Sequence, residues 1–69
     1  MSNWQTVYKS SFQHQADIVK DVLHNSGIQS IVVNKQDSSY VNFGYYEVHV
    51  TPDDVIKAMK IIEVDIKFD

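Results

Sequence analysis

The densest run of side chains that could bind a ligand or a partner reads KQDSSY over residues 35–40. Its acid and serines can donate and accept hydrogen bonds, and its tyrosine ring could stack on a contact or seal it. Such contacts are carried more often by loops than by buried elements. The alternative is local, because Asp and Ser side chains bond nearby backbone and hold a wide hairpin tip. The structural role is favoured, and the contact role has these candidate residues: Lys35, Asp37, Ser38, Ser39 and Tyr40.

A second pair with chemical potential is Glu47 and His49, two residues apart in an alternating segment. On a strand this spacing places both side chains on one face, where they could tune a proton or bind a metal. No third ligand is visible in the sequence, so we interpret the pair as exposed cross-strand polarity. His14 and His24 are ten residues apart and do not form an i,i+4 metal pair. We therefore predict no metal and no cofactor.

A nucleophilic role for Ser38 or Ser39 would require a base within hydrogen-bond reach. No nucleophile elbow or comparable motif surrounds either serine. A chain of 69 residues also leaves little room for a closed pocket. The sequence therefore predicts that the protein is not an enzyme.

Composition narrows the class of protein further. Sixty-nine residues allow one domain, 1–69, whose small core leaves stability marginal, so we expect a homo-oligomer. There is no cysteine to form disulfides or thiolate metal sites, which fits a reducing compartment. No apolar run is long enough to span a bilayer and the N-terminus does not resemble a secretory signal, so we expect a cytoplasmic protein without membrane contact.

Charge argues against nucleic acid as a partner. The net charge is −3, and the basic residues are six isolated lysines with no arginine. Phosphate binding needs clustered cations, because counterion release supplies most of the affinity. Strand aromatics such as Trp4, Tyr8, Tyr45 and Tyr46 leave RNA binding as an alternative, but packing or self-association explains the same rings more simply.

The first half of the chain predicts a strand, a helix and a second strand. Residues 3–9 (NWQTVYK) alternate in the manner of a strand. Ser10 and Gln13 match a capping box for a helix that begins near Phe12. Gly27 is placed to end this helix in a left-handed conformation, with the following isoleucine packing back on it. Residues 28–35 (IQSIVVNK) are β-branched and predict the second strand.

The second half predicts a hairpin and another helix. Residues 36–44 are rich in turn formers. Residues 45–50 alternate, with Tyr46, Val48 and Val50 on one face and the odd-numbered residues on the other. Residues 51–54 (TPDD) indicate a helix start, and residues 64–69 fit either a last strand or an extension of that helix.

This order predicts an α+β fold, a ferredoxin-like βαββα(β) two-layer sandwich. A right-handed crossover leaves room for the third strand between the first two. Both helices then cover one face of an antiparallel sheet, and the other face stays open for a partner.

Three stretches, 16–23, 27–28 and 33–40, together resemble the small bacterial proteins grouped as putative prokaryotic signal-transducing proteins. Residues 4–8, 47–50 and 53–55 are similar in kind, so the resemblance covers residues 4–62. It implies a ferredoxin-like fold related to PII-type nitrogen regulators, whose loop between the second and third strands contacts partners. In PII-type regulators, nucleotide binds between subunits. The corresponding loop of this chain, residues 36–44, is much shorter than the PII loop, and the chain lacks arginine and a Gly-rich phosphate cradle. The family supplies no catalytic residue.

We therefore expect a non-catalytic regulatory module that interacts with a protein partner or with further copies of itself. The alternative is a small-molecule sensor that, like PII-type or ACT-like regulators, binds its ligand between subunits.

Overall fold

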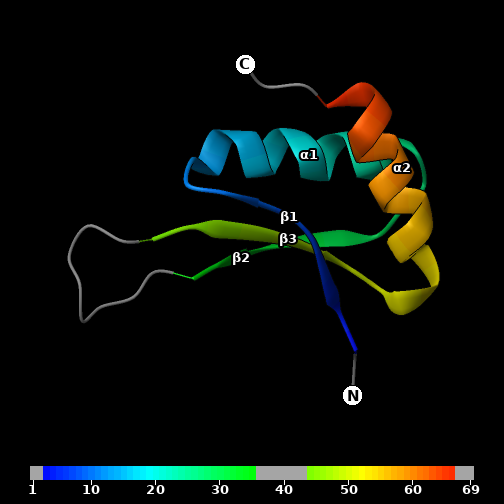
Figure 1. The fold of residues 1–69 in the computed structure, drawn as a ribbon, viewed down its shortest axis with the longest axis horizontal. Coiled ribbons are helices and arrows are strands. Elements are labelled where there is room, and N and C mark those ends of the chain that lie inside the picture. Colours follow the sequence, from blue (N-terminus) through cyan, green and yellow to red (C-terminus); the bar gives the residue numbers. More distant parts are fainter. Residues whose placement is uncertain (1–2, 36–43, 67–69) are drawn as a thin grey trace.

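The computed structural model describes residues 3–35 and 44–66 and arranges them as a three-stranded antiparallel sheet with two α-helices (Figure 1). The elements follow the order predicted from the sequence: β1 (Gln5–Ser10), α1 (Gln13–Asn25), β2 (Ser30–Asn34), β3 (Tyr46–Val50), a 3-10 turn η1 (Pro52–Asp54) and α2 (Val55–Asp65). The predicted α+β class is confirmed, and the order is consistent with a ferredoxin-like fold.

The strands are arranged β1-β3-β2, so the third strand lies between the first two as expected. β3 is antiparallel to both neighbours. Its alternation separates the two faces of the sheet: Val48 and Val50 are fully buried on the side of α1, whereas Glu47 and His49 lie on the other side.

A β-bulge interrupts the pairing of β1 with β3. Thr6 is opposite His49 and Tyr8 is opposite Val48, so Val7 is the extra residue. Val7 and Tyr8 both pack against the core. Without the extra residue, regular alternation would turn Thr6 towards the helices; with it, Thr6 shares a face with Glu47 and His49.

The start of α1 differs from the prediction. The N-cap residue is Phe12, and no side chain caps the helix. The hydroxyl of Ser10 instead accepts a hydrogen bond from the Phe12 amide at 3.0 Å and donates one to Gln15 Oε1 at 2.7 Å. The capping box of Ser10 with Gln13 is therefore wrong, because β1 continues through Ser10 and the helix begins two residues later than a box would need.

The end of α1 is as predicted. Gly27 has a φ of +82°, and its amide donates to the His24 carbonyl at 3.0 Å. The Ile28 amide donates to the Leu23 carbonyl at 2.9 Å, which completes a Schellman motif. Ile28 is then buried with Leu23 in the core, so the helix end also positions the chain for β2.

The second helix begins one turn later than a simple cap at Thr51 would place it. Pro52 opens the 3-10 turn, and α2 follows from Val55. Thr51 caps no backbone amide, and its hydroxyl donates to Asp54 Oδ2 at 3.4 Å. At its other end α2 stops at Asp65, and Ile66 is extended. Helix therefore does not continue through Ile66, and residues 67–69 lie outside the described part of the chain.

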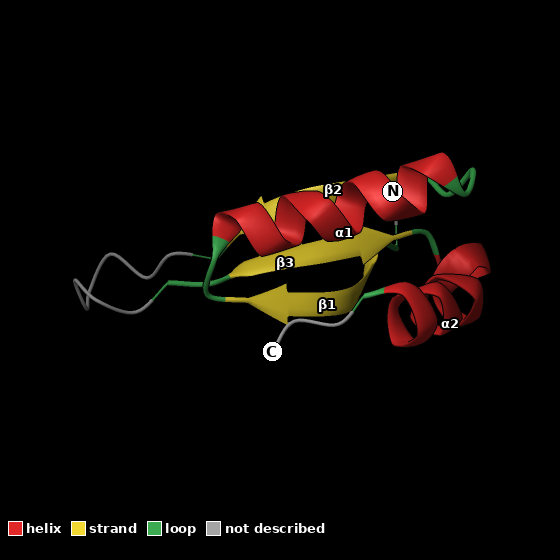
Figure 2. Cartoon of the chain, turned by 90° about the horizontal axis from the view of Figure 1, so that it is seen from above, coloured by secondary structure: helices red, strands yellow, loops and turns green. Residues whose placement is uncertain are grey.

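The two helices contact the sheet differently. Figures 1 and 2 show α1 lying lengthwise over one face, in contact with all three strands. α2 crosses the C-terminal end of α1 and packs against β1, and its Ala58 is buried in the core. No described helix lies across the opposite face of the sheet, which we call the uncovered face.

Candidate functional site

The centre of the uncovered face is occupied by Glu47, which is only 6% exposed. It is the one charged residue that is buried among those the structure describes. Glutamate is rarely buried unless it is paired, because removal of a carboxylate from water is costly. Its surroundings must therefore compensate for the lost hydration.

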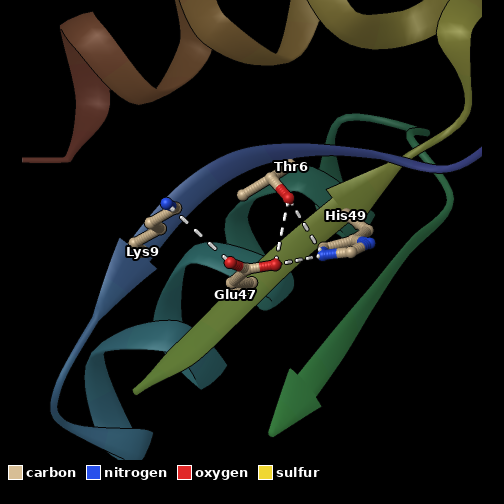
Figure 3. Close-up of polar contacts among 4 residues, drawn as sticks. All are labelled: Thr6, Lys9, Glu47 and His49. Atoms are coloured by element: carbon tan, nitrogen blue, oxygen red, sulfur yellow. Dashed lines mark hydrogen bonds and ion pairs between the residues drawn. The ribbon is translucent and has the colours of Figure 1, made fainter. Parts of the chain in front are cut away.

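Three side chains from two strands provide that compensation, and Figure 3 shows them on the side of the sheet away from α1. The Thr6 hydroxyl donates to Glu47 Oε1 at 3.1 Å, and His49 Nε2 lies 2.8 Å from the same oxygen. Lys9 Nζ lies 3.9 Å from Glu47 Oε2. We call Thr6, Lys9, Glu47 and His49 the Glu47 cluster.

The hydrogen-bond geometry assigns the proton positions. A carboxylate can only accept, so His49 Nε2 must carry the hydrogen that it shares with Glu47. The Thr6 hydroxyl hydrogen already goes to Glu47, so Thr6 Oγ1, 3.0 Å from His49 Nε2, accepts from the same N–H. A further proton on His49 would therefore bind at Nδ1.

These contacts lower the pKa of Glu47 below its ordinary value, and the His49 hydrogen bond is the largest cause. Burial acts in the opposite direction, while the Thr6 hydrogen bond and the charges of Lys35 and His49 lower the pKa further. The Lys9 side chain is 64% exposed, so its ion pair with Glu47 is screened by water and adds little. Glu47 is therefore held as a carboxylate.

The arrangement differs from a nucleophilic triad. In a triad the nucleophile and the acid bind opposite ring nitrogens of the histidine, so that the acid supports the proton transfer. Here Thr6 and Glu47 both bind Nε2, and the Thr6 proton points to the acid rather than to a base. In the described residues no three His, Cys, Asp or Glu side chains are grouped to hold a metal ion.

This finding corrects the interpretation of Glu47 and His49 as exposed polarity. His49 is 15% exposed at its side chain and Glu47 is 8%. The sequence indicated that the two share a face, but the burial depends on flanking strands. Thr6 was missed because the bulge that turns it towards Glu47 depends on the pairing with β3.

Around the Glu47 cluster the uncovered face is partly apolar and cationic. Ile31 and Tyr45 are 41% and 40% exposed. Lys9 Nζ lies 5.6 Å from the centre of the Tyr45 ring, within range of a cation–π interaction. Beside them a shallow hollow of about 390 Å³ is lined by Lys9, Ser10, Ser11 and Tyr45.

Comparison with known proteins identifies the family. A family model described as putative prokaryotic signal transducing protein matches residues 4–64. The chain belongs to this family. A search of curated proteins and a search of solved structures found no match. Within the described residues of this family member, no helix has the length and apolarity needed to cross a membrane.

The candidate contact residues predicted from the sequence are placed only in part. Lys35 is exposed directly after β2, and its amide donates to the Tyr45 carbonyl at 2.8 Å. This bond continues the ladder between β2 and β3, so Lys35 and Tyr45 are neighbours at the border of the uncovered face. The other four candidates, Asp37, Ser38, Ser39 and Tyr40, lie outside the described residues.

Proposed function

We propose that the protein is a non-catalytic regulatory module of signal transduction that binds a partner protein with its uncovered sheet face. The observation that carries this proposal is the Glu47 cluster, a charged group buried within a sheet face that no described helix covers.

A partner could cover this cluster at little cost. Burial of a carboxylate is expensive when its hydrogen bonds to water are lost without replacement. Glu47 has already exchanged water for bonds from Thr6 and His49. A surface placed over it would therefore remove little remaining hydration.

The surrounding residues indicate the chemistry of the partner. Tyr45 and Ile31 supply the aromatic and aliphatic area that anchors protein interfaces. Lys9 and Lys35 supply exposed cations, and Glu47 is the only acid within the three described strands. Although the whole chain has a net charge of −3, this face is complementary to an apolar surface with an acidic rim.

We include the segment after β2 in the proposed contact. Lys35 lies beside Tyr45 at the border of the uncovered face, and the four other candidate residues follow it closely in sequence. Asp37, Ser38, Ser39 and Tyr40 would then extend the contact with polar side chains and an aromatic ring.

The combined substitution Lys9→Glu and Tyr45→Ala is expected to weaken partner binding at least about tenfold, since each truncated anchor of an interface contributes about 1 kcal/mol or more. Proteins retained by the immobilised wild-type chain would be identified, and the dissociation constant of the purified binder measured by calorimetry. The triple variant Asp37→Ala, Ser38→Ala, Tyr40→Ala should also weaken binding and keep its circular dichroism spectrum.

Lys57→Glu is the matched control, because Lys57 is exposed on α2 away from this face. It should bind as the wild type does. The proposal would be refuted if a partner bound the wild type and the Lys9→Glu, Tyr45→Ala variant with equal affinity. It would also be refuted if no retained protein bound the wild type more tightly than the variant.

The hollow beside Lys9 supports a second candidate, a small-molecule sensor. It combines one cation with two serines and a tyrosine ring, groups that suit a carboxylate or phosphate ligand. A thermal-shift series with nucleotides, amino acids and 2-oxo acids should then raise the melting temperature of the wild type, because a ligand that binds only the native state stabilises it. Lys9→Glu should abolish the shift, and no shift at millimolar ligand would exclude this candidate.

A further inference from the structure

β2 is an outer strand of the sheet, and among the residues that the structure describes it pairs with β3 alone. Its sequence, SIVVN, has three β-branched aliphatic residues and no charge. An edge of this kind presents backbone donors and acceptors to any extended chain that can pair with it.

The ladder with β3 shows which residues face outwards. The Lys35 amide bonds to the Tyr45 carbonyl, and backbone bonding alternates along an antiparallel pair. Val33 and Ile31 therefore direct their backbone groups towards β3. Ser30 and Val32 direct theirs towards the outer edge.

The outer edge is complementary to itself. In a second copy placed antiparallel with Val32 opposite Val32, Ile31 of each copy meets Val33 of the other. Ser30 then meets Asn34, so apolar residues face apolar ones and polar residues face polar ones. Lys35 meets Gln29, so this register places no like charges opposite one another.

We propose that β2 pairs with β2 of a second copy about a two-fold axis through Val32, which joins two three-stranded sheets into one continuous sheet. The axis is perpendicular to the sheet, so α1 of both copies lies on the same side. Ile31, which is 41% exposed, gains Val33 of the second copy as a neighbour beside it and stays on the uncovered face. The contact is isologous, as in most homodimers, and does not rest on the proposed partner binding.

Cysteine crosslinking tests the register, because the chain has no cysteine of its own. Ile31 and Val33 form a non-hydrogen-bonded pair across the new ladder, with their Cβ atoms close enough for a disulfide. Oxidation of an equimolar mixture of Ile31→Cys and Val33→Cys chains should give a covalent dimer of one chain of each kind, and neither variant alone should crosslink. Ile56→Cys, at a 73% exposed position on α2, measures crosslinking by random collisions and should form no covalent dimer.

Crosslinking of Ile31→Cys alone, or of Val33→Cys alone, would overturn the axis through Val32. In sedimentation velocity, the wild type should be a dimer. Ile31→Lys should raise the dissociation constant of the dimer at least tenfold and leave the circular dichroism spectrum unchanged. Ile56→Lys should remain dimeric. If the wild type is a monomer at a chosen concentration of about 100 µM, the pairing is overturned. A monomer that still binds a partner through Lys9 and Tyr45 would leave the proposed function intact.

Discussion

Replacement of Leu23 by alanine is expected to lower the free energy of unfolding by about 2 to 5 kcal/mol. Leu23 is fully buried and, with Ile28, is among the largest completely buried side chains of the described residues. Its removal leaves a cavity that α1 and the sheet can fill only in part. At the usual stability per residue, 69 residues correspond to a total of roughly 3 to 10 kcal/mol, so this one substitution would remove a large share of it.

Urea unfolding followed by far-UV circular dichroism and by the fluorescence of Trp4, the single tryptophan, measures this loss. Ile18→Ala is the matched control, because Ile18 lies on the same helix and is 44% exposed. It should cost less than about 1 kcal/mol. Similar losses for the two variants would contradict the packing of α1 with Leu23 towards the sheet.

The elements that were predicted correctly depend on neighbours in sequence. The turn at Gly27 follows from the freedom of glycine at positive φ, and the structure shows that φ at +82°. The two faces of β3 follow from strict alternation. In each case the physical cause lies within a few residues.

The features that were not predicted depend on pairing between distant strands. Ser10 and Gln13 satisfy a capping pattern locally, but the pairing of Ser10 with Tyr46 keeps Ser10 in β1. Val7 fits simple alternation, yet it is the extra residue of a bulge, and both it and Tyr8 pack against the core.

The burial of Glu47 has the same origin. On its own strand the residue is a polar position facing away from the core. Its burial arises from side chains of β1 and β3 that meet only in the folded sheet. Sequence patterns could therefore place the residue on the correct face, but they could not show its hydrogen bonds or its burial.

Replacement of Glu47 by glutamine is expected to lower the free energy of unfolding at pH 7 by about 1.5 to 3 kcal/mol, the range for hydrogen bonds to a charged group. Glutamine retains an acceptor for Thr6 and His49 but loses the negative charge that strengthens both bonds. Its amide nitrogen would also lie towards Lys9, which can only donate. Glu63→Gln, on the exposed part of α2, is the control and should change stability by less than about 0.5 kcal/mol.

The stability difference between the wild type and Glu47→Gln should decrease as the pH is lowered. The pKa of Glu47 is lower in the folded protein than its ordinary value of 4.5, so the unfolded chain binds the proton more readily. The stabilisation by the carboxylate is therefore complete above about pH 5 and is lost as the pH falls through the folded pKa. Urea unfolding at a series of pH values between 7 and 3 should show the wild type and Glu47→Gln converging as the pH decreases.

A double-mutant cycle with Thr6→Val identifies the source of this stabilisation. Thr6 and Glu47 share a hydrogen bond, so their substitutions should be non-additive by about 0.5 kcal/mol or more at pH 7. The coupling should decrease as the pH falls through the folded pKa of Glu47, because protonation removes the charge that strengthens the hydrogen bond. A Glu47→Gln protein that is more stable than the wild type at pH 7 would contradict the compensated carboxylate. It would show that the buried charge is a cost to folding and that the uncovered face retains it for binding alone.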